Sequence, residues 1–492
     1  MPRFELKQST RHITSYAGLI LVGQCLEAAR LDLLDKKFPV PKGQIPTPDI
    51  VKSYIGLLAL GKSDFEAIEA FRKDRFFRQA LGIGTVPSSA WLRQRMEMLA
   101  VALREETDAY SVRLLRNAEA PVTAMNGFVC LDFDTFVMDN SGTKKECVDR
   151  TYQGVDGYTP IAAYLGNEGW CLALELRLGS QHSALETHYF LERVLPRAHE
   201  LAPAGLPVLS RSDSGFDSVR LLFQQDDEKR AWALEGRTFE YLVKWNPRKQ
   251  VMADWVAHAT EADAWVETRQ GKRVALLDLT VKRSWEKGKR DFRLVVRLIE
   301  RTVDPKGQVL LFPEYKLEGW WTSLDAKPEK VIELYREHGT HEQFHSEIKS
   351  DLDLERLPSG KFDCNDLILH LAMLAYNSLR LIGQTGLLGK ASPVRHPAKR
   401  RRLKTVLQEI MYRAAQYIRK ARKLVLDFGC QCPAFQAFAL IQEHLQEARH
   451  SPWPPGFRPR ISAWQRMTAR VRGGIAKNTG IPHHLRWIRG NG

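Results

Sequence analysis

The spacing of apolar residues predicts helices over roughly the first 120 residues. A Thr-Pro-Asp cap at residues 47–49 precedes an apolar run at residues 50–55, and Gly61 follows where that helix can end. A second helix is expected to open with Pro-Ser-Ser at residues 87–89 and to continue through residues 90–96. This second helix is a candidate recognition helix of a helix-turn-helix motif, and an ordinary surface helix with two arginines explains it equally well.

From about residue 123 the pattern changes to short apolar runs that are typical of strands. These runs lie at residues 127–131, 158–165, 171–176 and 207–210. Residues 226–317 are rich in β-branched and aromatic residues separated by turn breaks, which predicts a β-rich insertion. Helical spacing returns at Pro328 and lasts to about residue 450, where Pro and Gly residues indicate a linker.

The charge of the chain is concentrated near its C-terminal end. With 73 Lys and Arg against 58 Asp and Glu the net charge is +15, which favours a polyanionic partner such as nucleic acid. Residues 395–423 hold eleven Lys or Arg and a single acid, Glu409, and residues 452–492 hold eight and no acid. We expect residues 400–423 to form a basic helix that contacts the DNA backbone.

The sequence gives no indication of a membrane or secreted protein. No run approaches the ~20 apolar residues of a membrane-spanning helix, and no secretory signal precedes residue 30. The 7 Cys are scattered and suggest neither a disulfide framework nor a zinc ribbon. A cytoplasmic location without a membrane partner is therefore expected.

Two short motifs match known patterns but lack the required context. Residues 56–63 fit the phosphate-binding pattern G-x-x-x-x-G-K-[ST], yet they lie at the end of a predicted helix instead of after a strand. His341-Glu342-x-x-His345 fits the H-E-x-x-H pattern of zinc proteases, whose extended form needs Gly and His where this chain has Ile348 and Asp351. A helix terminus and chance histidines on a catalytic helix of another kind are the preferred interpretations.

Acidic residues lie where predicted strands and a helix would present them together. Asp132 and Asp134 continue the strand at residues 127–131, and because they are two positions apart they project from the same face. Asp213 follows the strand that ends at residue 210, and Glu342 lies on a helix after the β-rich segment. Converging carboxylates suit a pair of Mg²⁺ ions that act on a phosphodiester.

The helix with Glu342 carries the strongest resemblance to a known family. Residues 335–349 resemble the Y-x2-R-x3-E-x6-K signature of DDE-type bacterial insertion-sequence transposases, with Tyr335, Glu342 and Lys349 at the matching positions. His338 stands where the family has an arginine. Residues 208–216 and 131–135 are similar to the segments that hold the first two acids of the family.

This resemblance implies an α/β fold of the RNase H-like, retroviral-integrase type. It implies that Asp134, Asp213 and Glu342 are the catalytic and metal-binding residues, with Asp132 as the alternative first acid. Two Mg²⁺ ions, for which Mn²⁺ can substitute, are the expected cofactors. In this mechanism water cleaves a strand at each element end, and the freed 3′-hydroxyl attacks the opposite strand or target DNA.

The resemblance also implies which residues hold DNA. Tyr335 and Lys349, with His338 assisting, would contact the phosphates of the element end. Backbone contacts are expected from the basic region as well, at Arg400, Arg401, Arg402 and Lys404. Relatives with the insertion use an aromatic side chain to stack on a flipped base. The candidates here are Trp232, Trp245, Trp255, Trp265, Trp285, Trp320 and Trp321.

Together the patterns and the resemblance predict an RNase H-like mixed-sheet core interrupted by a β-rich insertion, with helical N-terminal and basic helical C-terminal regions. The expected parts are an N-terminal helical DNA-binding region (1–122), the first part of the core (123–225), the insertion (226–317), the second part of the core with the Glu342 helix (318–395) and the basic C-terminal region (396–492).

The resulting hypothesis is a transposase that cleaves insertion-sequence ends and transfers strands into target DNA. Double-stranded DNA at the element ends and the target is the expected partner, with a homodimer in the synaptic complex and association with the bacterial nucleoid. The alternatives are an RNase H-like nuclease without strand transfer and an inactive DNA-binding derivative of a transposase.

Overall fold

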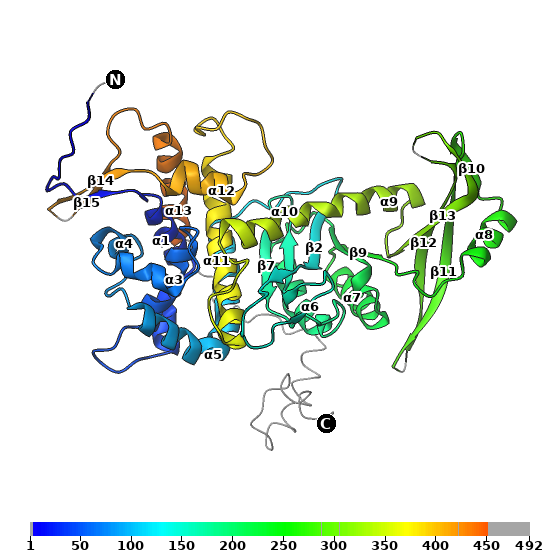
Figure 1. Cartoon of the computed structure of the whole chain (residues 1–492), viewed down its shortest axis with the longest axis horizontal. Coiled ribbons are helices and arrows are strands. Elements are labelled where there is room, and N and C mark those ends of the chain that lie inside the picture. Colours follow the sequence, from blue (N-terminus) through cyan, green and yellow to red (C-terminus); the bar gives the residue numbers. More distant parts are fainter. Residues whose placement is uncertain (1–2, 287, 305, 422, 451–492) are drawn as a thin grey trace, which may run out of the picture.

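A computed structural model describes residues 3–450 except 287, 305 and 422. The expected linker after residue 450 and the basic tail at 452–492 lie outside this range. Figure 1 shows three parts in a row: the N-terminal helices with the end of the described chain, a central sheet, and a group of long strands at the opposite end. Every helix among the described residues is too short or too polar to span a bilayer.

The N-terminal helices pack around one long, almost fully buried helix, α11 (Phe362–Gly386). α5 (Ser89–Asn117) lies along it and begins at the predicted cap, where the Ser88 hydroxyl accepts from the Trp91 amide. On α5, Arg95 is buried and donates to Thr47, which favours a packing helix over a recognition helix. The other elements here are α1 (Leu19–Ala28), α2 (Leu34–Lys37), α3 (Thr47–Leu58) and α4 (Arg75–Ala80), with short 3-10 segments at Leu31–Leu33 and Phe65–Phe71.

The phosphate-loop pattern at residues 56–63 is a helix terminus, as expected. Gly56 belongs to α3, and Gly61 has a left-handed φ of 59° just after the helix ends. A Cβ at Gly56 would meet Leu81 only 2.5 Å away, so this glycine permits close packing of the helix.

A nine-stranded mixed sheet forms the centre, in the order β10-β11-β12-β13-β9-β8-β2-β6-β7. Strands β2, β8 and β9 are parallel and almost continuously buried, as expected for a sheet covered by helices. The core strands are β2 (Val129–Thr135), β6 (Ile161–Leu165), β7 (Trp170–Glu175), β8 (Val208–Ser212) and β9 (Phe239–Lys244), accompanied by α6 (Thr187–Leu201), a 3-10 turn (Ser214–Phe216) and α7 (Val219–Ala233). A small sheet of β3 (Met138–Asp139), β4 (Asp149–Arg150) and β5 (Asp156–Tyr158) flanks them.

The strand-rich segment continues this central sheet. Residues 226–233, expected at its start, belong instead to α7, and β9 pairs with the core strand β8. The residues Trp320-Trp321-Thr322 at the end of β13 pair with β9 and so join the long strands to the core. The long strands are β10 (Trp265–Arg269), β11 (Lys272–Trp285), β12 (Gly288–Val303) and β13 (Val309–Thr322), with α8 (Met252–Glu261) packed on them.

The helix that carries the signature is interrupted twice. α9 (Pro328–Arg336) passes through a 3-10 segment at Glu337–Thr340 into α10 (His341–Ser346), and a π-helical turn follows at Glu347–Asp351. α9 contacts β11 and β13, whereas α10 contacts β2, so this broken helix runs along the sheet from the long strands to the core (Figure 1).

The basic helix expected at residues 400–423 is largely absent, which corrects that prediction. Helical structure is confined to α12 (Leu403–Val406) and a π turn (Leu407–Met411), after which β14 (Ala415–Lys420) and β15 (Lys423–Asp427) form a hairpin. Aromatic and β-branched residues of β14 and β15 favour the strand form, and β1 (Ile13–Thr14) supplies a third strand from the other end of the chain. α13 (Phe435–His450) is the last described element.

Candidate active site

The strands β2 and β8 bring Asp134 and Asp213 to the same edge of the sheet. These strands are parallel, and their register pairs Asp132 with Arg211. Asp134 and Asp213 each lie two residues further along, at the carboxyl ends of the strands. Asp213 also accepts a hydrogen bond from the Gly215 amide at 2.9 Å, which holds it at the start of a 3-10 turn.

Asp213 and Asp134 differ in how readily they ionise. Burial, followed by the negative charge of Asp134, raises the pKa of Asp213 to about 6. Asp134 keeps a lowered pKa even though burial alone would raise it, because it is hydrogen-bonded to His341. A bound cation would favour the ionised form of both carboxylates. A site with two neighbouring carboxylates, one of which ionises with difficulty, is therefore suited to bind a cation.

Asp132 has a different environment from Asp134. Its carboxylate is 6% exposed and accepts two hydrogen bonds from Arg211, at 2.7 and 2.8 Å, while His338 Nδ1 lies 3.0 Å from Oδ1. Burial alone would raise the pKa of Asp132, but the charge of Arg211 outweighs burial and holds the pKa well below its usual value. Arg211 also donates to the Leu334 carbonyl on α9 and so ties that helix to the sheet.

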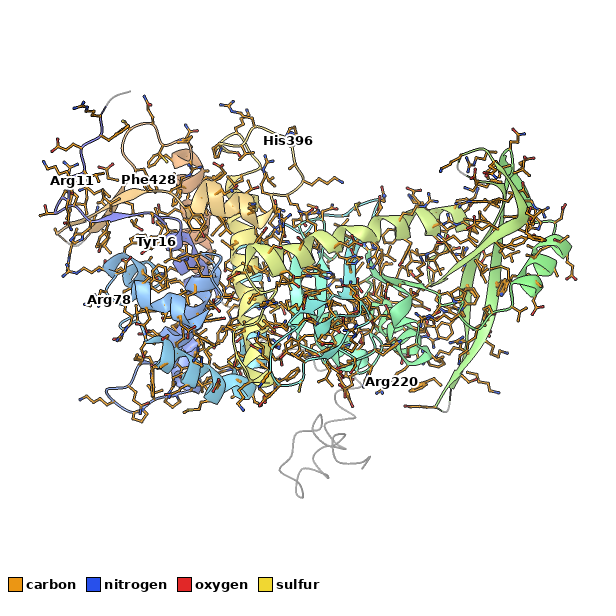
Figure 2. The ribbon with its side chains drawn as sticks, viewed as in Figure 1. Arg11, Tyr16, Arg78, Arg220, His396 and Phe428 are labelled. Carbon is orange, nitrogen blue, oxygen red and sulfur yellow. The ribbon has the colours of Figure 1, made fainter. Side chains whose placement is uncertain are left out.

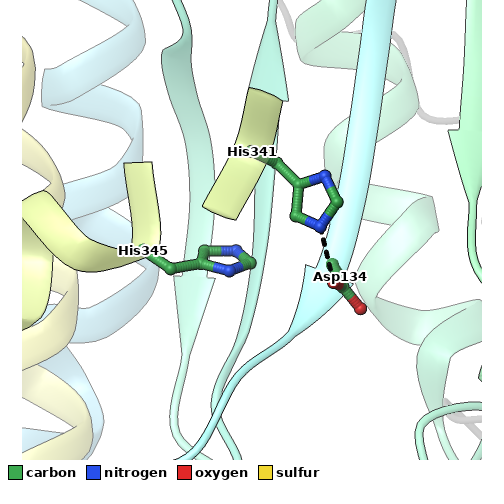
Figure 3. A group of neighbouring side chains, drawn as sticks. All are labelled: Asp134, His341 and His345. Carbon is green, nitrogen blue, oxygen red and sulfur yellow. Dashed lines mark hydrogen bonds and ion pairs between the residues drawn. The ribbon is translucent and has the colours of Figure 1, made fainter. Parts of the chain in front are cut away.

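The broken helix turns two histidines, and not Glu342, toward Asp134. His341 Nε2 lies 2.7 Å from Asp134 Oδ2, and the His341, His345 and Asp134 ligand atoms all lie within 4.8 Å of one another (Figure 3). Glu342 is exposed and makes no hydrogen bond or ion pair with any other part of the described chain. Successive residues of an α-helix are rotated by roughly 100° about the helix axis. Glu342 therefore points in a different direction from its neighbour His341.

Packing fixes the two histidine rings. His341 Nδ1 hydrogen-bonds the carbonyl of His338, so its Nε2 is the atom directed at Asp134. His345 stacks on Phe136 with ring centres 4.3 Å apart, and burial lowers its pKa to about 3. Burial also acts to lower the pKa of His341, but the hydrogen bond to Asp134 outweighs it and the pKa is raised.

The other signature residues have partners within the chain. The Tyr335 ring lies 5.6 Å from that of His338 and 6.0 Å from that of Trp320. Burial, with the charges of Asp213 and Asp134, raises the Tyr335 pKa well above its usual value. Lys349 bonds the Val137 carbonyl at 2.8 Å and pairs with Glu355 at 2.9 Å, so it joins the π-helical turn to the loop after β2.

The basic run at residues 400–402 points largely inward. Arg400 donates to the Asn167 carbonyl and to Gln343 on α10, and buried Arg401 donates to three backbone carbonyls. Arg402 pairs with Asp351 at 3.0 Å, whereas Lys404 is exposed. These arginines therefore support the helix that carries the candidate site.

Exposure separates the seven tryptophan candidates. Trp285 at the end of β11 is 36% exposed, and the Arg220 guanidinium lies 5.9 Å from its ring centre. The remaining candidates are buried or half-buried, namely Trp232, Trp245, Trp255, Trp265, Trp320 and Trp321. Trp285 is therefore the most exposed of the seven.

Comparisons with known proteins identify the family. The family described as "Transposase DDE domain group 1" matches residues 2–450. No curated protein gives a significant match. One similar solved structure is a cryo-EM structure of a piggyBac transposase synaptic complex with hairpin DNA, with a TM-score of 0.39 and 10% identity over 96% of this chain and 89% of that chain.

The family match covers most of the chain, including the sheet with Asp134 and Asp213 and the broken helix. It leaves no support for the metalloprotease alternative that His341 and His345 suggested. The chain belongs to the DDE-domain transposase family, group 1.

Proposed function

We propose that this transposase cleaves DNA at the ends of an insertion sequence and transfers the freed strands into target DNA. One observation carries the proposal: Asp134 and Asp213 lie together at the carboxyl ends of β2 and β8, and the charge of Asp134 helps to raise the pKa of Asp213. The signature helix lies beside them, since α10 contacts β2. Strand cleavage and transfer are phosphoryl transfers, which need negative charge to be neutralised at such a point.

The residues present fit divalent cations. Asp134 and Asp213 are neighbouring carboxylates, and the raised pKa of Asp213 indicates that no nearby cation fully offsets burial and their repulsion. Glu342 is exposed and is not turned toward Asp134 in this structure, so as a third ligand its side chain would have to turn toward the two aspartates. We assign these three acids as ligands of two Mg²⁺ ions, with Mn²⁺ as a substitute. When bound, such ions activate the attacking oxygen and stabilise the leaving oxygen.

We assign Asp134 and not Asp132 as the first acid. Both oxygens of Asp132 already accept hydrogen bonds from Arg211, and His338 shares one of them. Asp132 thus acts as a positioning residue that holds Arg211, and through it α9, against the sheet. His338 joins this pair, so we assign it a positioning role in place of the direct phosphate contact implied by the signature.

We propose two surfaces for the DNA. The first is the tip of the β11–β12 hairpin, where Trp285 would stack on an unpaired base beside Arg220. The second is the β14–β15 hairpin, where Lys420 and Lys423 lie directly opposite each other and Arg419 is exposed. Facing like charges repel, so a DNA phosphate between them is favourable.

The long strands with α8 would act as the insertion that presents Trp285, and two copies of the chain would hold the two element ends. Lys349 and Tyr335 would contribute to the binding of the cleaved end from their places beside the acids. Arg400–Arg402 support α10 from within, and exposed Lys404 is the member of that run that we propose for backbone contact.

The test is cleavage of a supercoiled plasmid that carries the DNA flanking this chain's own coding sequence. We expect nicks at the element ends with Mg²⁺, none with EDTA, and none in Asp134→Ala, Asp213→Ala or Glu342→Ala. Lys36→Ala, at an exposed position on α2, is the control and should cut normally. Cutting without joined products would indicate a nuclease, and end binding without any cutting would indicate an inactive derivative.

A further inference from the structure

The group formed by Asp134, His341 and His345 offers a donor set that differs from the one proposed for Mg²⁺. We infer that these three side chains form a binding site for a transition-metal ion of the Zn²⁺ or Co²⁺ class. The inference goes beyond the proposed cleavage reaction and shares one residue, Asp134, with its metal site.

The arrangement of the ligand atoms supports such a site. The three groups can each direct one atom to a common point, since those atoms lie within 4.8 Å of one another. His341 and His345 are four residues apart on α10 and so project from the same side of the helix, while Asp134 approaches from β2 (Figure 3). Two elements distant in the chain thus supply three ligands, the number of protein ligands that catalytic zinc sites use.

His345 provides a second and independent observation. The residue is 6% exposed, yet its Nε2 has no hydrogen-bond partner in the described structure. A buried polar atom without a partner costs free energy, roughly 1–3 kcal/mol. Stacking on Phe136 at 4.3 Å keeps the ring in this orientation, so the unpaired nitrogen is held in place beside His341.

The hydrogen bond of His341 is the one that metal-binding histidines commonly make. Its Nδ1 is bonded to the His338 carbonyl, which fixes the ring plane, and its Nε2 is hydrogen-bonded to Asp134. An ion bound here would replace the proton that Nε2 and Asp134 share. Arg400 also donates a hydrogen bond to Gln343 on the same helix, at 3.2 Å, and so helps to hold α10 in place. The site is therefore preorganised on its two histidine ligands.

The chemistry of the donors sets the preference among ions. Imidazole nitrogens suit Zn²⁺, Co²⁺ and other first-row transition ions, whereas Mg²⁺ prefers oxygen ligands. A transition ion held here would occupy the Asp134 carboxylate that the proposed Mg²⁺ site requires. We therefore expect Zn²⁺ to compete with Mg²⁺ and to inhibit strand cleavage.

The direct test is titration of the full-length, metal-free protein with Co²⁺, followed by visible absorption, and displacement of the Co²⁺ by Zn²⁺. We expect the wild type to bind one Co²⁺ ion, with a visible spectrum typical of nitrogen ligands. We expect the affinity for Co²⁺ to fall at least about tenfold in His345→Asn and in Asp134→Asn. His396→Asn, at an exposed histidine in the loop before α12, should bind as the wild type does.

Further variants separate this inference from the proposed function. Glu342→Ala should lose DNA cleavage and keep Co²⁺ binding, because Glu342 is outside the three-residue group. His338→Asn, a buried neighbour that bonds Asp132 instead of Asp134, should also keep Co²⁺ if its circular dichroism is native. Absence of a Co²⁺ spectrum in the wild type, or an unchanged one in folded His345→Asn, would overturn the inference even if Mg²⁺-dependent cleavage is intact.

Discussion

Arg211 lies across both carboxylate oxygens of Asp132, with N–O distances of 2.7 and 2.8 Å. The pair is almost fully buried, and it follows directly from the parallel register of β2 and β8. One of two neighbouring acids on a single strand is thus used to hold the structure together. The other, Asp134, is left to face Asp213 and the histidines of α10.

Substitution of Asp132 should therefore reduce stability. Asp132→Asn leaves the Arg211 charge buried without its counterion, and loss of one partner of a buried pair costs about 3–5 kcal/mol. Urea unfolding followed by tryptophan fluorescence measures the difference. Glu333→Gln on the exposed side of α9 is the control and should change the free energy of unfolding by less than about 0.5 kcal/mol. A neutral Asp132→Asn would contradict the role assigned to this pair.

Asp213→Asn should have the opposite effect on stability. In the folded chain the Asp213 pKa is about 6 against an ordinary 3.8, so the folded state binds the proton more tightly than the unfolded state. Stability is accordingly lost as pH rises from about 4 through about 6. We expect Asp213→Asn, with EDTA present, to raise the melting temperature at pH 8 and to leave it nearly unchanged at pH 4. Equal melting temperatures of the two proteins at pH 8 would contradict a raised pKa of Asp213 in the folded chain.

The buried pair of His370 on α11 and Asp108 on α5 predicts a separate pH effect on stability. Their Nδ1 and Oδ1 atoms lie 2.5 Å apart, and although burial alone would lower the His370 pKa, the charge of Asp108 outweighs it and raises the pKa. A raised histidine pKa stabilises the fold below its ordinary value of 6.5, and this contribution is lost as pH rises through the folded value.

We therefore expect the unfolding free energy of the wild type to fall between pH 6 and pH 9 by more than that of His370→Asn. Chemical denaturation at a series of pH values gives the comparison. The exposed His12→Asn is the matched control and should follow the wild-type curve. Parallel curves for the wild type and His370→Asn would rule out a charged His370 in the folded chain.

Trp285→Ala should weaken binding of DNA ends without unfolding the chain. Stacking of an unpaired base on an aromatic ring contributes about 1–3 kcal/mol, and the Trp285 ring is 36% exposed in the free protein. Fluorescence anisotropy with a DNA end that carries an unpaired base measures the loss. Trp320→Ala is the contrasting variant, because that ring is 2% exposed and its removal should cost about 3–5 kcal/mol of stability.

Lys420→Glu should stabilise the β14–β15 hairpin and weaken DNA binding at the same time. The change replaces a like-charge pair with Lys423 by an opposite-charge pair, which is worth roughly 0.2–1 kcal/mol. Loss of one phosphate contact should reduce the slope of log K against log salt concentration by about 0.9. Binding of duplex DNA at several salt concentrations measures the slope. Lys36→Glu makes the same charge change on α2 and should leave the slope unaltered, so equal slopes for both variants would exclude the hairpin as a contact.

The sequence by itself determined several local elements and the residues of the signature, but not the fold of residues 226–233 or 400–423. The apolar runs predicted β2, β6, β7 and β8 because strands buried on both faces are rich in apolar residues, and the cap at residues 47–49 predicted α3. The spacing of the residues from Tyr335 to Lys349 indicated the family that the later comparison identified.

Tertiary structure decided which partners the charged residues contact. Composition alone could not tell that Arg400–Arg402 bond to α10 and to backbone carbonyls, because a basic run looks the same whether its partners are phosphates or distant parts of the chain. Only the strand register separated Asp132 from Asp134, and only the breaks in the helix turned His341 and His345, and not Glu342, toward the sheet. These outcomes depend on contacts between residues that are far apart in sequence. A local sequence pattern contains no information about the charges that such contacts bring together.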